Sequence, residues 1–253
     1  MHTIGNTLFV GKVWMHLPAL DSTNTYALEL LSKSNPAEGT VISADFQRQG
    51  RGQLGSSWQS EAGQNIITSF ILYPVFISPR HQFHLNQAIA LSVYDFVSAQ
   101  VSATVRIKWP NDIYVDDKKL GGILIQNNVS PNSIKSSVAG IGINVNQLHF
   151  PENLPNPCSL AQLTAKTYDI RSLIALLGEC VEKRYLQLRR GQIEQIQKDY
   201  ILCLYRFMED SLFRRIDGHV FSGRITGLSP SGKLLIHHQD GEEAFGLKEI
   251  QFL

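Results

Sequence analysis

In the first part of the chain, short runs of apolar and β-branched residues alternate with segments whose apolar positions recur at helical spacing. The runs predict three strands, at residues 10–17, 39–47 and 65–74. Between the first two strands, DSTNTYALELLSKSN predicts a helix with Ser22 or Thr23 as its N-cap and Asn35-Pro36 as its end. A second helix is predicted over residues 78–100, where apolar residues recur near every third or fourth position.

The middle of the chain predicts further strands and then a long helical region. Residues 105–129 predict a hairpin that turns at Asp116-Asp117-Lys118, and residues 133–147 predict another strand. Residues 159–206 are predicted to be helical because they contain an apolar stripe, formed by Leu173, Leu176, Leu177, Cys180, Val181 and Tyr185.

The pattern changes near Met208. The remaining residues form short alternating runs that are separated by three turn signals, Asp217-Gly218, Ser231-Gly232 and Asp240-Gly241. Such closely spaced turns predict a small β-barrel. The expected fold is therefore α+β, with a mixed sheet flanked by helices over residues 1–207 and a C-terminal β-barrel domain over residues 208–253.

Composition narrows the class of protein. The 253 residues carry 23 basic and 22 acidic side chains, so the net charge is +1 and the basic surplus typical of nucleic-acid-binding proteins is missing. No run reaches the roughly 18 apolar residues of a membrane span, and the N-terminus lacks the apolar core of a signal peptide. A cytoplasmic protein is expected. The three cysteines include no CxxC pair, so the sequence favours neither a disulfide framework nor a zinc site.

The stretch GRGQLGSSW, residues 50–58, matches the spacing G-x-G-x-x-G. A dinucleotide-binding loop needs a helix directly after it, whereas a polar segment and a predicted strand follow here. A kinase glycine loop fits between strands, but the other kinase motifs are missing. A turn with incidental glycines is the simplest alternative. Arg48 and Arg51 favour a different role, because a flexible loop with two guanidinium groups and many backbone N–H groups can bind an anion and close over it.

Four other stretches contain candidate chemistry, each with a structural alternative. In KWPND, Pro110 bends the chain, and Asn111 and Asp112 either point into a site or cap the strand end. In KLGGIL, two glycines let a ligand approach the backbone beside Lys119, which otherwise is a turn lysine on the solvated face.

The other two stretches are DSTN and GIGINVN. The first is an N-cap whose hydroxyl groups can also face a small polar ligand. The second places Asn144 in an apolar strand, where either the backbone or a ligand must satisfy its amide.

Taken in order, DSTN, QRQGRGQLGSSW, KWPND, KLGGIL and GIGINVN resemble the motifs of the biotin protein ligases, over nearly the whole chain. The resemblance implies a catalytic domain shared with lipoate ligases, followed by an SH3-like barrel. It also implies two reactions: biotin and ATP give biotinyl-5′-AMP and pyrophosphate, and the biotinyl group then passes to a lysine of a biotin carboxyl carrier protein or domain. Biotin, ATP and Mg²⁺ are the expected small molecules.

The resemblance also assigns residues by their motifs. Arg51 and Lys119 would be catalytic by this resemblance, and Asp112 is a further catalytic candidate because it is the carboxylate of the otherwise apolar KWPND segment. Biotin would be bound by residues of three motifs, namely Ser22, Thr23, Asn24, Gln47, Arg51, Gly52, Gln53 and Lys119. The nucleotide would lie near Gly50, Gly55, Trp58, Asn111 and Asn144. The metal ligands are not assigned.

The chain departs from the family pattern in two places. Gln53, Leu54 and Ser56 stand where many members have arginine, which implies looser retention of the adenylate or a different set of anion contacts. Only 20 residues precede Asp21, too few for the helix-turn-helix domain of the repressor-type members, so no DNA partner is expected. A homodimer is compatible with the resemblance.

The chemistry agrees with these residue types. Biotin's carboxylate attacks the α-phosphate of ATP, so Mg²⁺, Arg51 and Lys119 would offset the repulsion between two anions. Water would hydrolyse the resulting anhydride, so a closing loop is expected. Asp112 would orient or deprotonate the incoming lysine. The alternatives are a lipoate ligase or octanoyl transferase, a biotin-sensing repressor, and an interaction protein with a decayed catalytic domain.

Overall fold

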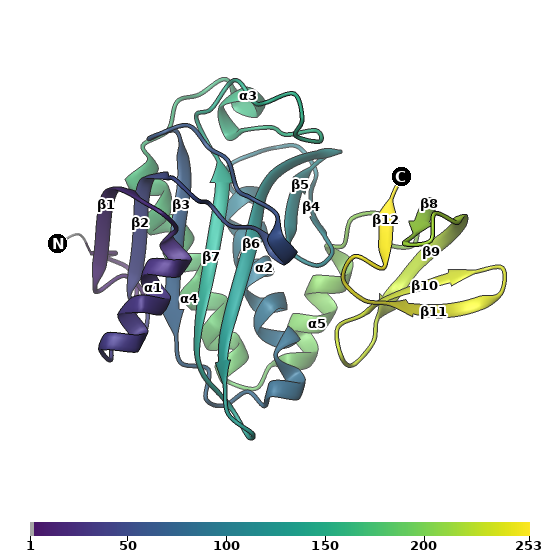
Figure 1. Ribbon diagram of the computed structural model, residues 1–253, viewed down its shortest axis with the longest axis horizontal. Helices are drawn as coiled ribbons and strands as arrows, with labels where there is room; N and C mark the ends of the chain where they lie inside the picture. Colours follow the sequence, from purple (N-terminus) through teal and green to yellow (C-terminus); the bar gives the residue numbers. More distant parts are fainter. Residues whose placement is uncertain (1–2) are drawn as a thin grey trace.

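The computed structural model describes residues 3–253, apart from the side chain of Leu54, so the predicted first domain begins two residues before the described range. A seven-stranded mixed sheet forms the centre of the molecule (Figure 1). Its strands are β1 (Trp14–Leu20), β2 (Val41–Gln47), β3 (Asn65–Leu72), β4 (Val105–Lys108), β5 (Asp112–Val115), β6 (Lys118–Val129) and β7 (Ile134–Asn144). Their order is β1-β2-β3-β7-β6-β5-β4, in which β1 and β2 run parallel and the other neighbours run antiparallel.

Helices cover both faces of this sheet. They are α1 (Thr23–Lys33), α2 (Phe83–Ser98), α3 (Leu160–Thr164), α4 (Ile170–Arg189) and α5 (Ile193–Leu202), with 3-10 turns η1 (Gln53–Gly55) and η2 (Pro79–His81). In Figure 1, α1 lies in front of the sheet, and α2, α4 and α5 lie behind it. Side chains alternate accordingly: Ile71 of β3 packs in the smaller core with α1, whereas Phe70 and Leu72 pack in the larger core. No helix within residues 3–253 combines the length and apolar content of a membrane span.

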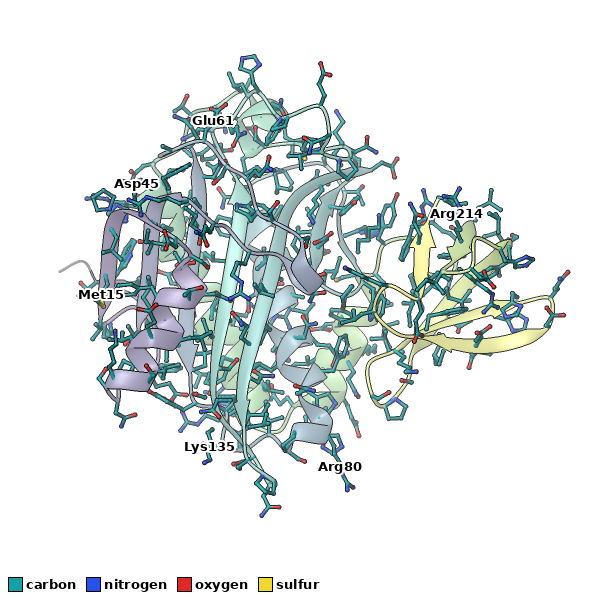
Figure 2. The ribbon with its side chains drawn as sticks, in the orientation of Figure 1. Met15, Asp45, Glu61, Arg80, Lys135 and Arg214 are labelled. Atoms are coloured by element: carbon teal, nitrogen blue, oxygen red, sulfur yellow. The ribbon has the colours of Figure 1, made fainter. Side chains whose placement is uncertain are left out.

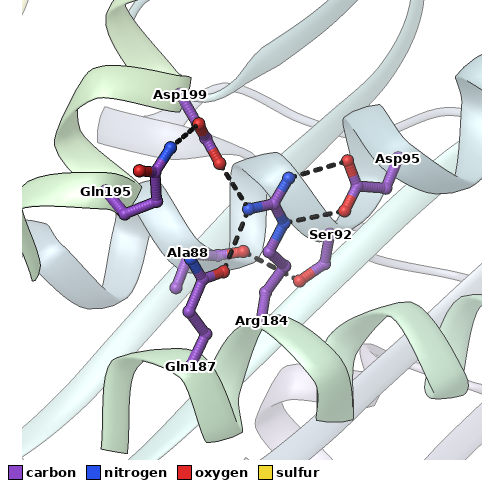
Figure 3. Close-up of polar contacts among 7 residues, drawn as sticks. All are labelled: Ala88, Ser92, Asp95, Arg184, Gln187, Gln195 and Asp199. Atoms are coloured by element: carbon purple, nitrogen blue, oxygen red, sulfur yellow. Dashed lines mark hydrogen bonds and ion pairs between the residues drawn. The ribbon is translucent and has the colours of Figure 1, made fainter. Parts of the chain in front are cut away.

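One arginine ties the three rear helices together (Figure 3). Arg184 of α4 donates from Nε and Nη2 to the two carboxylate oxygens of Asp95 on α2, at 2.7 and 3.0 Å. Its Nη1 donates to Asp199 of α5 at 2.7 Å. Burial alone would lower the pKa of Arg184, but the hydrogen bonds to the two carboxylates outweigh it and raise the pKa. The bidentate hydrogen bonds fix the relative positions of the helices, and the ion pairs neutralise the buried charges.

A buried carboxylate fastens the N-terminal segment to α4. Glu182 accepts hydrogen bonds from the backbone N–H groups of Leu8, Phe9 and Val10, at 2.7, 2.8 and 3.0 Å. These N–H groups therefore point at a side chain instead of a neighbouring strand. Val10 is thus bonded to Glu182 and Gly11 adopts a left-handed φ of 70°, and the strand predicted at residues 10–17 begins only at Trp14.

The two other long predictions are also divided by local backbone geometry. The helical region predicted over residues 159–206 contains three helices, since Ala165 and Gly191 adopt left-handed φ angles of 56° and 76° between them. The hairpin predicted over residues 105–129 contains three strands, because the segment around Pro110 separates β4 from β5.

The C-terminal strands form a second sheet. They are β8 (Asp210–Arg215), β9 (Val220–Leu228), β10 (Leu234–His238), β11 (Gly241–Phe245) and β12 (Ile250–Phe252), all antiparallel. The three predicted turns fall between consecutive strands, with positive φ at Gly218, Gly232 and Gly241. The order is β11-β10-β9-β8-β12, and within residues 3–253 no pairing joins β11 to β12. The sheet is therefore open, and the SH3-like barrel stays a prediction.

The Glu182 contact predicts a large effect of a small substitution. Glu182→Gln replaces one acceptor oxygen by an N–H₂ group that faces backbone donors. We expect the free energy of unfolding in urea to fall by about 2–4 kcal/mol, since hydrogen bonds to charged groups are lost and buried donors are left unpaired. Glu179→Gln on the same helix is the control, because the Glu179 carboxylate makes no hydrogen bond in the described part of the chain. Equal stability of the two variants would contradict the role of Glu182.

Candidate functional site

A cavity of about 360 Å³ lies on the α1 face of the central sheet. Its walls come from the start of α1, the end of β2, the loop through η1, and β6 and β7. The lining includes twelve of the residues singled out from the sequence: Ser22, Thr23, Asn24, Gln47, Arg51, Gly52, Gln53, Trp58, Asn111, Asp112, Lys119 and Asn144. Residues from five separate motifs are thus brought together around one cavity.

Glycines on the two central strands form the floor of this pocket. A Cβ atom at Gly140 would lie 2.2 Å from Oδ1 of Asn24, and one at Gly142 would lie 2.6 Å from the indole ring of Trp58. Any larger residue at either position would need that side chain to move. Gly122 of β6, which pairs with Gly142, is less crowded, with its nearest atom at 3.4 Å. Glycine within a strand is expected where another group approaches the backbone closely.

Uncharged polar groups occupy the pocket wall at the level of Gly140. The backbone N–H and the hydroxyl group of Thr23 both donate to Oε1 of Gln47, at 2.7 and 3.1 Å. Asn24 donates to the carbonyl of Leu124 at 3.1 Å and accepts from the hydroxyl group of Ser69 at 2.6 Å. These contacts fix the side chains that face the cavity.

Ser22 precedes this network in the chain. It is the N-cap of α1, and its Oγ accepts from the backbone N–H of Thr25 at 3.5 Å. The sequence prediction that Ser22 or Thr23 starts the helix is therefore confirmed, and Ser22 also lines the cavity. Both the capping and the pocket-lining interpretations of DSTN hold.

Charged groups lie at the next level along the strands. Nζ of Lys119 lies 2.7 Å from Oδ2 of Asp112, and both side chains are half-buried. A Cβ atom at Gly122 would lie 3.4 Å from the Asp112 carboxylate, so the pair lies over Gly122. Gly122 pairs with Gly142, and Leu124 pairs with Gly140. The neutral and charged levels are therefore two residues, or about 7 Å, apart.

The glycine-rich segment is part of a long connection, residues 48–64, between β2 and β3. Gly52 N–H donates to the carbonyl of Ser56 at 2.7 Å, and Trp58 N–H donates to the carbonyl of Gly50 at 2.9 Å. Gly50 and Gly55 do not line the cavity. A Cβ at Gly50 would meet the Trp58 carbonyl at 2.2 Å, so this glycine permits the close crossing of the two loop arms. This strand-to-strand connection, with no following helix, agrees with the rejection of a dinucleotide-binding loop.

Arg51 is the exposed cation of this loop. Its side chain lines the cavity, and within residues 3–253 its guanidinium group makes no ion pair. Arg48 lies outside the lining and instead lies 3.6 Å from Asp21 at the surface. The charged residues of the lining are therefore Arg51, Lys119 and Asp112.

Two polar side chains in the lining differ in how they are satisfied. Nδ2 of Asn144 donates to the carbonyl of Cys158 at 2.9 Å, so its amide nitrogen has a backbone partner. Nε1 of Trp58 is buried without a partner among the described residues. A buried indole N–H normally has an acceptor, so the Trp58 nitrogen is a donor that a ligand in the cavity can use.

Some residues of the pocket were missed by the sequence analysis. Gly140 and Gly142 carry a signal, since they alternate in GIGIN on the strand face that also holds Asn144. The segment after β7 carries none: Phe150, Leu154, Pro155 and Pro157 line the cavity through tertiary packing. Cys158 follows directly and is buried, which raises the pKa of its thiol to about 12.

The fold and site define an α+β protein whose central sheet carries a small-molecule-sized pocket, mainly apolar in its lining but with several convergent polar and charged groups. Residues 17–146 match the model of the biotin/lipoate A/B protein ligase family. The chain belongs to this family.

Relatives agree with this assignment over most of the chain. The bifunctional ligase/repressor BirA of Bacillus spizizenii is 33% identical over 242 residues, which span 93% of this chain and 72% of that protein. A biotin–[acetyl-CoA-carboxylase] ligase of Mycobacterium tuberculosis is 30% identical, over 75% of this chain and 71% of that protein.

A solved structure is similar throughout. The biotin protein ligase of Aquifex aeolicus in complex with biotin and ATP superposes with a TM-score of 0.77 at 25% identity, covering 96% of this chain and 99% of that chain. The similarity therefore includes the second sheet as well as the central one.

The glycine floor yields a prediction about Trp58. In Gly142→Ala the new methyl group would lie 2.6 Å from the indole ring, so we expect Trp58 to move outward. Acrylamide quenching of tryptophan fluorescence should increase, since the other two tryptophans, Trp14 and Trp109, are buried. Gly122→Ala is the matched control because its methyl group would approach the same ring only to 3.5 Å. Equal quenching in both variants would show that Gly142 does not set the position of Trp58.

Proposed function

We propose that this chain is a biotin–protein ligase. It joins biotin and ATP into biotinyl-5′-AMP and pyrophosphate, and it transfers the biotinyl group to a lysine of a biotin carboxyl carrier domain. The observation that carries the proposal is that one pocket contains a neutral hydrogen-bonding level and a charged level, with the cations Lys119 and Arg51 in its lining. Biotin has the same division, with an uncharged ureido ring at one end and a carboxylate at the other.

The neutral level favours biotin over lipoate. The hydroxyl and amide groups of Thr23, Asn24 and Gln47 can exchange hydrogen bonds with the N–H and C=O groups of a ureido ring. The dithiolane ring of lipoate has no such groups, so it could form none of these hydrogen bonds. A site built to bind N–H groups discriminates strongly against an analogue that lacks them.

The two cations of the pocket lining suit the first reaction. A carboxylate oxygen of biotin attacks the α-phosphorus, the bond to the bridging oxygen breaks, and pyrophosphate leaves. Arg51 and Lys119 offset the charge that accumulates between the two anions. Mg²⁺ would enter on the triphosphate and add to this screening. Among the described residues no cluster of three metal-ligating side chains occurs, and Asp112 is the carboxylate of the lining, which suits an ion held mainly by phosphates and water.

The second reaction needs a neutral lysine. At pH 7, removing a proton from an amine of ordinary pKa costs about 4.6 kcal/mol. The amine attacks the carbonyl carbon of the anhydride, the bond to the phosphate oxygen breaks, and AMP leaves as the amide forms. In our proposal Asp112 orients the amine and accepts its proton.

The loop of residues 50–58 would act as a lid over the intermediate. Gln53 and Ser56 are uncharged, so Arg51 supplies the loop's cation in the pocket lining. The glycines allow the loop to fold onto the adenylate and exclude water from the anhydride. Retention of the intermediate then depends on Arg51 and on the neutral Gln53 amide.

The proposal includes the division into a catalytic domain over residues 1–207 and an SH3-like domain over residues 208–253. It also includes a cytoplasmic location, with no DNA partner, in keeping with the net charge of +1. Homodimer formation stays a prediction from the resemblance.

The first reaction is tested by pyrophosphate exchange. Wild-type protein should exchange pyrophosphate into ATP when biotin is present and not when lipoate replaces it, and mass spectrometry should find biotinyl-AMP. Arg51→Ala and Lys119→Ala should each lower the rate by about 100-fold or more, as for other groups that stabilise developing charge. Lys118→Ala, the exposed neighbour, is the control. Lipoate-dependent exchange in the wild type would overturn the biotin assignment, and full exchange in either variant would remove that residue from the first reaction.

The role of Asp112 is tested with preformed biotinyl-AMP and a carrier domain. Asp112→Asn should slow transfer by about 10²–10⁴-fold at neutral pH, the usual contribution of a positioned base, and part of the loss should return as pH rises. Asp116→Asn, in the neighbouring turn, should transfer at the wild-type rate, since asparagine tolerates its positive φ. Unchanged transfer in Asp112→Asn would exclude Asp112 as orienting group and base.

A further inference from the structure

The C-terminal sheet meets the KWPND segment at a buried hydrogen bond. Nε1 of Trp109 donates to the carbonyl oxygen of Gly232 at 3.0 Å, and the Trp109 side chain is 8% exposed. Gly232 lies in the turn between β9 and β10, with a φ of +84°. On its other side it touches Phe83 at the start of α2, because a Cβ atom on Gly232 would lie 2.3 Å from Cγ of that ring. Gly232 therefore contacts both rings: its carbonyl oxygen accepts from the indole of Trp109, and its α-carbon lies close to the phenyl ring of Phe83.

The first residues of KWPND are held from outside the pocket. Nζ of Lys108 lies 4.8 Å from the ring centre of Tyr114 and 5.1 Å from that of Phe252 on β12. The carbonyl of Pro110 accepts from the hydroxyl group of Tyr200 on α5 at 3.0 Å. Lys108 and Trp109 therefore contact the C-terminal sheet, and Pro110 contacts the rear helices.

The last residues of KWPND are held from inside the pocket. Nδ2 of Asn111 donates to the carbonyl of Ile123 at 2.6 Å, and the N–H of Ile123 donates back to the Asn111 carbonyl at 3.0 Å. Asp112 forms the ion pair with Lys119. Five consecutive residues thus connect the C-terminal sheet to the charged level of the pocket.

We propose that Trp109 and Gly232 form a latch through which the C-terminal sheet positions Asn111, Asp112 and Lys119 for the reaction. The inference rests on the proposed function for the reaction it names. Trp109 and Gly232 are positioning residues, since they act through the segment between them and the pocket. The neutral level, formed by Thr23, Asn24 and Gln47, has no hydrogen bond to residues 108–112 in the described structure.

The physical basis is geometric. Only glycine combines a φ near +84° with so close a contact to the Phe83 ring. The indole donates through a single N–H group, so replacing it by phenylalanine keeps most of the ring and removes the hydrogen bond. Catalysis is sensitive to displacements of about 1 Å at the reacting groups, whereas binding at a separate level of the pocket is not.

Trp109→Phe and Gly232→Ala test the latch. In biotin-dependent pyrophosphate exchange we expect kcat to fall by about 10-fold or more in each variant, because Lys119 and Asp112 are displaced. The KM for biotin should stay within about twofold, because the neutral level is intact. Adding Phe83→Leu to Gly232→Ala should restore part of kcat, since the smaller side chain makes room for the methyl group.

Two controls separate positioning from stability. Trp14→Phe removes a buried indole hydrogen bond of 2.8 Å to Ser43 at the far edge of the sheet. Gly218→Ala places alanine at a φ of +90° in another turn of the C-terminal sheet, where no atom lies within 4 Å. Both should lower the melting temperature and leave kcat unchanged. Wild-type kcat in the two latch variants, or equal losses in the controls, would overturn the proposal.

A second readout is independent of the reaction. The Ile123 N–H is bonded to Asn111, so hydrogen exchange of the peptide containing Ile123 should accelerate in Trp109→Phe and Gly232→Ala but not in the controls. Unchanged protection would overturn the latch even if the protein proves to be a biotin ligase. If the wild-type protein makes no biotinyl-AMP but hydrogen exchange at Ile123 is faster in the two latch variants, the latch would be supported and the proposed function would fail.

Discussion

The pocket depends on the absence of side chains along one face of two central strands. Residues on β7 alternate, so that Ile141 and Ile143 fill the rear core while Gly140 and Gly142 face α1. The space that two ordinary side chains would occupy is taken by Asn24 and Trp58, which approach the strand backbone from different segments. Neither contact can form on a strand of larger residues, and both the start of α1 and the end of the loop would then be displaced. The glycines of β7 therefore determine where the cavity lies, and the polar residues are arranged around them.

The rigidity that such a cavity needs comes from the opposite face. There α2, α4 and α5 pack on the larger core, and Arg184 bonds to a carboxylate on each of its two neighbouring helices. Figure 2 shows how densely side chains fill this body, with Lys135 and Arg80 at one end and the C-terminal sheet, marked by Arg214, at its side. The glycine floor of the pocket, with Lys119, Asp112 and Asn144, thus lies on strands that are packed against helices on their rear face. The connection in front, residues 48–64, is by contrast long, largely exposed and rich in glycine.

The sequence predicted the elements and the motif residues better than it predicted the boundaries. Periodicity identified both sheets, and motif order selected the residues that line the cavity, because such motifs contain chemistry in local spacing. It missed the start of β1, since the Glu182 carboxylate that binds residues 8–10 is 172 positions or more away in the chain. It missed Phe150 and Leu154 for the same reason, as their position results from tertiary packing. Gly50 permits a chain crossing and lies outside the lining, so its predicted place near the nucleotide stays a prediction.

The charge balance of the pocket links its two proposed reactions. The lining holds two cations and one carboxylate, and Lys119 is already paired with Asp112 at 2.7 Å. An anionic substrate must therefore compete with Asp112 for Lys119, while Arg51 can bind it without breaking an ion pair. In the proposed reactions the substrate anion would draw Lys119 away from Asp112, which would then lose its partner. An unpaired, half-buried carboxylate then has a strong preference for a new cation, and the ammonium group of an acceptor lysine supplies one. In this proposal the ion pair would set the order of events, because Asp112 would become available to the acceptor only after the anion has engaged Lys119.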